Sequence, residues 1–178
     1  GAEAEVEIEE HTSHAAADVI FRTLFSIPIE HALASEVFAR FRDYQRTQPI
    51  LNLAAFVPLP SWMPRLHRRR TRAAAARIRR LITQLTEARM AEIKAGTAPD
   101  DLATKIMTTP DPQTGECFDT AEMVDQVAIF FLAGHETSAS ALGWALYLLA
   151  LHPEVQDRVA AEVATLPVQP TFADLSTL

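Results

Sequence analysis

Polar residues interrupt the most apolar stretch of the chain, which reads FFLAGHETSASALGWALYLL over residues 130–149. Gly134, His135, Glu136, Thr137 and Ser138 follow one another in its first half. Imidazole, carboxyl and hydroxyl groups exchange protons, form hydrogen bonds or bind metal ions. A carboxylate buried without a partner is costly, so plain core packing explains Glu136 poorly. The interruption therefore marks a candidate site.

The start of this run is similar to one kind of zinc site. His135 and Glu136 begin like the zinc-protease signature His-Glu-x-x-His, which places two histidines on one face of a helix. Ala139 occupies the position of the second histidine. The zinc-protease interpretation therefore fails, and we expect no metal ligand among these residues.

Small side chains also recur at helical spacing along this stretch, because residues three and four apart share a face. Ile129 lies one turn before the small residues and Leu132 beside them, which gives an apolar wall, while Glu136 lies at the edge. A broad, flat molecule can lie against such a face; close packing of a second helix is the alternative. The small residues are Ala133, Gly134, Thr137, Ser138 and Ala141.

Helical periodicity and the presence of only 5 glycines predict an all-α fold. The long central helix that carries the polar residues is predicted over 119–151, because Asp119 and Glu122 form a start that resembles a capping box. Pro153 opens the next helix at its first turn, and that helix ends before Pro167. Further helices are predicted over 8–24, 30–46, 65–94 and 101–108, with a loop over 108–116.

The segment between the second and third predicted helices is apolar but contains Pro49, Pro58, Pro60 and Pro64. Prolines prevent a regular helix or strand, and an apolar loop is unusual because loops normally run over the surface. The segment is therefore a loop packed on the core, a mobile lid over an apolar pocket, or a tip that dips into a membrane.

Arginines cluster in the third predicted helix, between Arg65 and Arg80. Such a run is typical either of a solvated helix face that pairs with acidic groups or of a nucleic-acid-binding surface. No aromatic residues lie between the arginines to stack on bases, and the net charge is -7. We favour the solvated face and expect no nucleic-acid partner.

The composition, 48% hydrophobic and 22% charged over 178 residues, is typical of one globular domain. The single cysteine, Cys117, cannot form an internal disulfide, which favours a reducing cytosol. The stretch 127–151 is long enough to span a membrane, but its centre carries His135 and Glu136, and no Lys or Arg flanks its start. We expect a cytoplasmic protein without a membrane span.

Three stretches resemble one enzyme family. AGHETS, over 133–138, looks like the central-helix signature of the cytochrome P-450 family, the haem-thiolate monooxygenases. ALGWALYLLALHPEVQDRVAAEV, over 141–163, resembles the continuation of the same signature, and DPQTGE, over 111–116, also fits. By this resemblance the first two helices match the E and F helices, the apolar segment the F–G loop and the basic helix the G helix.

The resemblance implies an all-α P-450 fold whose central helix crosses the distal face of a haem. It implies that Thr137 hydrogen-bonds oxygen at the haem iron and that Glu136 belongs to the proton supply, in the manner of general acid catalysis. Ile129, Leu132 and Ala133 would face a hydrophobic small-molecule substrate, and His135 is a side residue. The cofactor contacts would be Ala133, Gly134, Thr137, Ser138 and Ala141.

The implied reaction uses O2 and electrons from NAD(P)H, delivered by a ferredoxin- or flavodoxin-type partner. Two family features are missing: the axial cysteine in its glycine-containing loop and the Glu-x-x-Arg pair. Cys117, in TGECFD, lacks the cysteine pattern. We therefore expect residues 1–178 to form a single partial domain, the middle of a soluble bacterial enzyme, without the N-terminal and haem-thiolate regions and inactive by itself.

Two other classes of function remain as alternatives. The chain could be a non-catalytic helical interaction or binding domain derived from this fold. It could also be a helical nucleic-acid binder that uses the arginine run.

Overall fold

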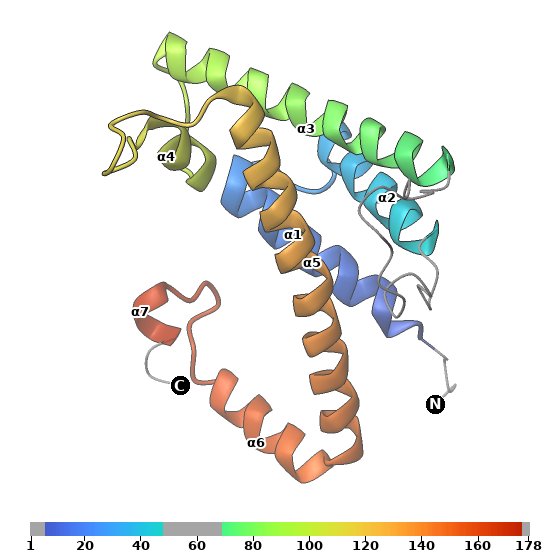
Figure 1. The fold of residues 1–178 in the computed structure, drawn as a ribbon. Helices are drawn as coiled ribbons and strands as arrows, with labels where there is room; N and C mark the ends of the chain where they lie inside the picture. The colour runs from blue at the N-terminus through green and yellow to red at the C-terminus, as the bar shows by residue number, and fades with distance from the viewer. Residues whose placement is uncertain (1–5, 48–68, 176–178) are drawn as a thin grey trace.

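The structure, a computed structural model, describes residues 6–47 and 69–175. Within these ranges it contains helices and no strand, so the predicted all-α class is confirmed (Figure 1). The helices are α1 (Ile8–Phe25), α2 (Ala32–Thr47), α3 (Arg69–Ala95), α4 (Leu102–Thr108), α5 (Thr120–Leu151), α6 (Pro153–Val163) and α7 (Phe172–Leu175). The predicted helices lie within a few residues of α1 to α6, whereas α7 was not predicted. The apolar Pro-rich segment lies outside the described residues.

Local signals fix both ends of α5. Asp119 accepts a hydrogen bond from the Glu122 backbone N–H at 2.8 Å, and Glu122 Oε2 accepts one from the Asp119 N–H at 2.9 Å. The predicted capping box is thus confirmed, and it satisfies two N–H groups that have no partner inside the helix. At the other end, Pro153 stands at the first turn of α6 and cannot donate a backbone hydrogen bond to α5.

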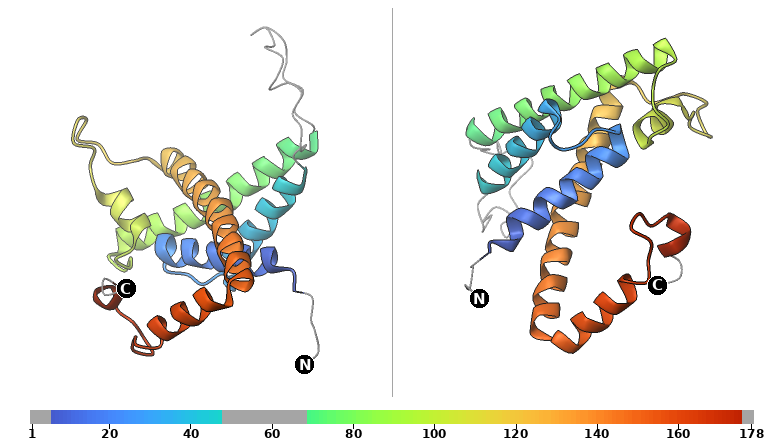
Figure 2. Two further views of the ribbon diagram at one scale, coloured as in Figure 1. Left: turned by 90° about the horizontal axis from the view of Figure 1, so that it is seen from below. Right: turned by 180° about the vertical axis from the view of Figure 1, so that it is seen from behind.

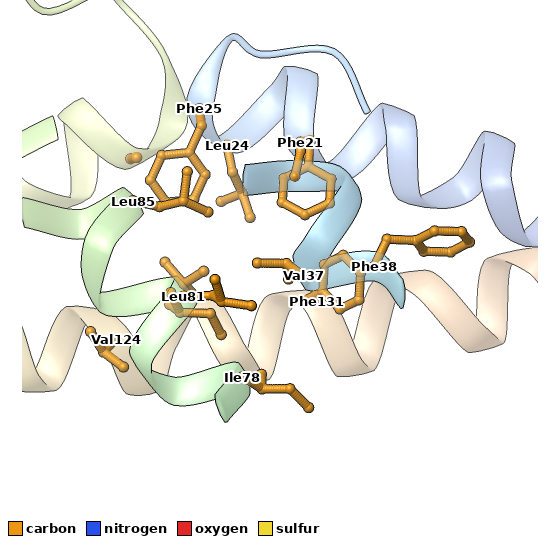
Figure 3. Packing of buried hydrophobic residues seen from close by; sticks show 14 of the residues in the cluster. Phe21, Leu24, Phe25, Val37, Phe38, Ile78, Leu81, Leu85, Val124 and Phe131 are labelled. Carbon is orange, nitrogen blue, oxygen red and sulfur yellow. The ribbon is translucent and has the colours of Figure 1, made fainter. Parts of the chain in front are cut away.

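Among the described residues, a hydrophobic core joins α1, α2, α3, α4 and the first half of α5. Phe131 of α5 belongs to it, and its ring centroid lies 5.3 Å from that of Phe21 of α1 (Figure 3). The ring centroid of Phe41 of α2 lies 4.4 Å from that of Phe131. Burial of each such side chain stabilises the fold by about 1.5–3 kcal/mol. The core therefore fixes the rotation of α5 about its axis and so decides which of its side chains face outward.

A buried ion pair ties the ends of three helices together. The Arg89 guanidinium of α3 lies 2.7 Å from the Asp101 carboxylate, and it also donates to the Phe25 carbonyl at 2.6 Å. Asp101 caps α4 by accepting from the Thr104 N–H at 3.0 Å, and the Ser26 hydroxyl donates to Asp101 at 2.9 Å. Each buried charge thus has partners, as the low polarity of the interior requires.

The second half of α5 and the whole of α6 lie away from the core (Figure 2). Trp144, Tyr147, Leu148 and Leu151 are exposed on α5, and no residue of α6 is buried. Although α5 is largely apolar, no helix of the described ranges is long and apolar enough to cross a membrane.

In the first half of α3, the described arginines of the arginine run lie on the surface, as the solvated-face interpretation predicts: Arg72, Arg77, Arg79 and Arg80 are exposed. Arg79 pairs with Asp125 of α5 at 2.8 Å. Exposed pairs of this kind contribute about 0–1 kcal/mol, so they adjust the surface of the fold but do not hold it together.

Candidate functional site

The central helix has one buried face and one open face. Its buried residues are Met123, Val124, Val127, Phe131, His135 and Ala139. Side chains about half a turn away from these point outward, because a helix turns about 100° per residue. Ile129, Ala133, Thr137 and Ala141 belong to this second set, and all four are exposed. We call the row Ala133, Thr137 and Ala141 the open stripe.

Gly134 does not belong to the open stripe. It is half-buried against α1, and a Cβ placed on it would lie 3.1 Å from Ile20 Cδ1. The absence of a side chain therefore serves the close packing of α1 on α5, which is the alternative that the sequence left open for the small residues. Ser138 is exposed on the same flank of the helix. The predicted cofactor contacts of Gly134 and Ser138 stay predictions.

Thr137 forms a hydrogen bond within the helix: its hydroxyl donates to the carbonyl oxygen of Ala133, one turn earlier. A hydroxyl has one proton to donate and two lone pairs with which it accepts. In this rotamer the proton is used by the helix, and the acceptor capacity remains for a donor on the open stripe.

Glu136 lies at the border between the open stripe and α2. The side chain is exposed, and its Oε2 accepts a hydrogen bond from Gln45 Nε2 at 2.9 Å. An exposed carboxylate keeps most of its hydration, so the cost of burying a charge does not arise here. Glu136 therefore stands where solvent reaches it, one residue before Thr137.

His135 points into the protein and has a structural environment. It is 3% exposed, its Nε2 lies 2.8 Å from Ser13 Oγ of α1, and its ring stacks on Phe131 with centroids 5.2 Å apart. Burial lowers the pKa of His135 below its ordinary value, while the nearby Glu136 carboxylate acts in the opposite direction. The imidazole is therefore neutral at pH 7, and it lies on the face of α5 opposite to Thr137.

Apolar side chains stand next to the open stripe, toward the N-terminal end of α5. Ile129 is 57% exposed and Leu132 is 45% exposed. Large apolar side chains exposed side by side mark surfaces that bind an apolar partner or ligand. We call Ile129 and Leu132 the apolar wall. Together with the open stripe they form one face of α5, with small residues at one end and the apolar wall at the other.

This face is compatible with a haem. Small side chains let a flat, largely apolar macrocycle approach the helix closely, and the exposed apolar wall borders it. Cys117 lies before the start of α5, whereas Thr137 lies about 25 Å further along that helix, because an α-helix rises ~1.5 Å per residue. Cys117 therefore does not fit the place of the axial ligand of a haem on the open stripe. Within the described ranges, no group of three or more His, Cys, Asp and Glu side chains is arranged to hold a metal ion.

Sequence reasoning missed two residues of this region, Gln45 and Ser13. Each contacts the HETS run from another helix, across 91 and 122 residues of chain respectively. Nothing in the local pattern of α1 or α2 distinguishes these side chains from other surface polar residues. Only the packing of α1 and α2 on α5 brings them to the site.

Comparison with known proteins gives one consistent result. The sequence matches the family described as Cytochrome P450 over residues 1–178. Cyclooctat-9-en-7-ol 5-monooxygenase of Streptomyces melanosporofaciens is 35% identical over 167 residues, which cover 90% of this chain and 34% of the relative. Cytokinin hydroxylase of Arabidopsis thaliana is 28% identical over 180 residues, which cover 98% of this chain and 35% of the relative.

Solved structures agree with the sequence relatives. The haem domain of cytochrome P450DA has a TM-score of 0.72 at 23% identity, covering 100% of this chain and 38% of that chain. The chain thus spans about a third of the length of the proteins it resembles. The two sequence relatives come from a bacterium and from a plant, so the similarity does not distinguish the predicted bacterial source from others.

Proposed function

The chain belongs to the cytochrome P450 family, and on that premise we propose that it is the middle part of a haem-dependent monooxygenase. The parent enzyme inserts one oxygen atom of O2 into a hydrophobic small molecule. The observation that carries this proposal is the face of α5 on which the open stripe, the apolar wall and Glu136 lie next to one another.

The open stripe is the part of this chain that would hold the haem. Ala133, Thr137 and Ala141 supply the small exposed side chains, Ser138 lies on one flank, and Gly134 contributes through backbone and through the close approach of α1. When bound with its cysteine ligand, which is not among these residues, the haem supplies the binding and reductive activation of dioxygen.

Glu136 and Thr137 divide the proton chemistry between them. Glu136 exchanges protons with solvent, because its carboxyl group is exposed at the border of the open stripe. The Thr137 hydroxyl accepts a hydrogen bond from water or donates one when it leaves the Ala133 carbonyl, and so orders the proton path beside the stripe. An acid that carries protons beside an alcohol that positions them is an arrangement for general acid catalysis.

Ile129, Leu132 and Ala133 form the substrate side of the face. Their exposed apolar surface favours a hydrophobic substrate, since it offers no charged or hydrogen-bonding side chain with which to hold a polar one. We further propose that NAD(P)H supplies the electrons through a ferredoxin- or flavodoxin-type protein, and that the enzyme is cytoplasmic and bacterial.

The test is isotopic. The full-length parent, supplied with a reductant and a panel of hydrophobic compounds under ¹⁸O₂, should give a product that carries one ¹⁸O atom. A protein that binds haem and these compounds but never forms labelled product would favour the non-catalytic binding domain. A protein that binds no haem would contradict the assignment of the open stripe.

A further inference from the structure

The hydrogen bond between Gln45 and Glu136 joins residues 91 positions apart and links α2 to the candidate proton carrier. We propose that Gln45 is a positioning residue that holds the Glu136 carboxyl group at the border of the open stripe in both of its protonation states. This inference rests on the proposed function, because it concerns how the proton supply of that site is kept in place.

Both partners stand on helices that the core holds firmly. Val37, Phe38 and Phe41 anchor α2, and Phe131 anchors α5. Gln45 is half-buried, so its side chain has fewer rotamers available than a fully exposed one. An exposed glutamate without a partner samples many rotamers, and fixing it costs up to about 2 kcal/mol of side-chain entropy. A hydrogen bond from a rigid neighbour offsets part of that cost.

The amide group is suited to a carboxyl group that gains and loses a proton. Its N–H₂ donates to a carboxylate, as it does here at 2.9 Å, and its carbonyl oxygen accepts from the O–H of a carboxylic acid once the amide turns over. An amide also carries no charge, whereas an arginine at this place would favour the carboxylate and lower its pKa. Gln45 therefore holds Glu136 without fixing it in one protonation state.

Charged side chains of the described residues surround this pair. A surface hollow lies beside Gln45 and Glu136. Glu9 and Glu10 of α1 line it together with Glu7, just before that helix, and Arg42 lines it from α2. Arg42 is engaged with Glu10, at 3.0 Å, and it also lies over the Phe38 ring.

Among the described residues, His135 of α5 is a further titratable neighbour. It is neutral at pH 7 because burial lowers its pKa. The hydrogen-bond partner of Glu136 in this hollow is thus an uncharged amide, while carboxylates of α1 and the guanidinium of Arg42 lie around it.

The experiment replaces Gln45 in the full-length parent by arginine, by glutamate and by leucine, with Gln156→Arg as the control. Gln156 lies on the exposed face of α6, so that variant adds the same charge away from Glu136. The Glu136 carboxyl pKa is read by NMR on ¹³C-labelled glutamate, with the resonance assigned by its loss in Glu136→Gln. The pH dependence of the ratio of product formed to cofactor oxidised is measured in parallel.

Gln45→Arg should lower the Glu136 pKa by about one pH unit. The acidic side of the pH profile, in which the ratio of product formed to cofactor oxidised is plotted, should move to lower pH by the same amount. Gln45→Glu should move both upward, and Gln45→Leu should lower coupling severalfold with unchanged substrate affinity. Gln156→Arg should leave the pKa and the profile in place.

Equal pKa values in the wild type, Gln45→Arg and Gln45→Glu would overturn the inference, even if stability changed. That result leaves the proposed function intact so long as labelled product is formed. Conversely, a parent that forms no product contradicts the proposed function, while the NMR titration still reports whether Gln45 contacts Glu136.

Discussion

The Nε2 atom of His135 lies 2.8 Å from the hydroxyl oxygen of Ser13, and this contact ties the polar run of α5 to α1 from the inside. His135 and Thr137 therefore have opposite roles although they are two residues apart. One packs in the core with a depressed pKa, and the other stands on the open stripe with its hydroxyl on the Ala133 carbonyl.

The buried histidine predicts a pH dependence of stability. Its pKa is lower in the folded protein than the ordinary value of about 6.5 that it has when unfolded. The unfolded state therefore binds more protons just below pH 6.5, so the free energy of unfolding falls as the pH drops from 6.5 toward the folded pKa, and is unaffected above it.

Denaturant unfolding of the full-length parent between pH 7.5 and 5 measures this effect. His135→Phe should flatten the slope below pH 6.5, whereas His152→Gln, a change at an exposed histidine, should not. Identical slopes in His135→Phe and the wild type would show that this imidazole takes up its proton as easily in the folded protein as in the unfolded one.

Removal of one partner of the buried ion pair should be severe. Arg89→Met leaves the Asp101 carboxylate buried and short of its closest cation, which should cost about 3–5 kcal/mol of unfolding free energy. Arg22→Met is the matched control, because Arg22 pairs with Asp18 on the surface, and it should change the free energy of unfolding far less. Similar losses in both variants, measured by urea unfolding, would contradict the importance given to the buried pair.

The two glycines of α5 allow a sharper test of packing. Gly143→Ala should stabilise the protein by up to about 1 kcal/mol, because a Cβ there meets Thr12 Oγ1 at an ordinary 3.9 Å and alanine is the better helix former. Gly134→Ala should gain less, since its Cβ approaches Ile20, and Gly134→Val should lose about 1–3 kcal/mol.

Ile20→Val, which shortens the crowding side chain, should restore part of the loss in Gly134→Val. Ile20→Val could instead fail to restore stability while Gly134→Ala changes the haem absorption spectrum. That result would show that glycine is required at position 134 by the haem and not by the packing of α1.

The elements could be predicted because their signals are local. The Asp119–Glu122 capping box, Pro153 at the start of α6 and the spacing of apolar residues each act within one or two helical turns. The four-residue α7 was missed because a helix that short carries no periodicity. The family signature likewise lies in a continuous run of residues, so the candidate residues could be named from the sequence.

The direction in which each residue of that run points could not be predicted. The sequence places five small residues on neighbouring positions of the helix surface. In the structure, Gly134 packs against α1, whereas Ala133, Thr137 and Ala141 are exposed. The partners of His135 and Glu136 come from α1 and α2, which reach the site only through the shared core. Contacts of this range depend on the path of the whole chain.

We infer that the Thr137 hydroxyl serves the chemistry of the open stripe and not the helix alone. The measurement is the ratio of product formed to cofactor oxidised in the full-length parent and in Thr137→Ala. Thr23→Ala is the matched control, because the Thr23 hydroxyl donates to the Val19 carbonyl of α1 at 2.7 Å in the same one-turn geometry.

Thr137→Ala should keep its fold and its substrate affinity, consume cofactor, and release more hydrogen peroxide and less hydroxylated product. Thr23→Ala should keep the wild-type ratio. An unchanged ratio in Thr137→Ala, with only the small stability shift expected of a lost helix hydrogen bond, would show that the Thr137 hydroxyl serves the helix alone.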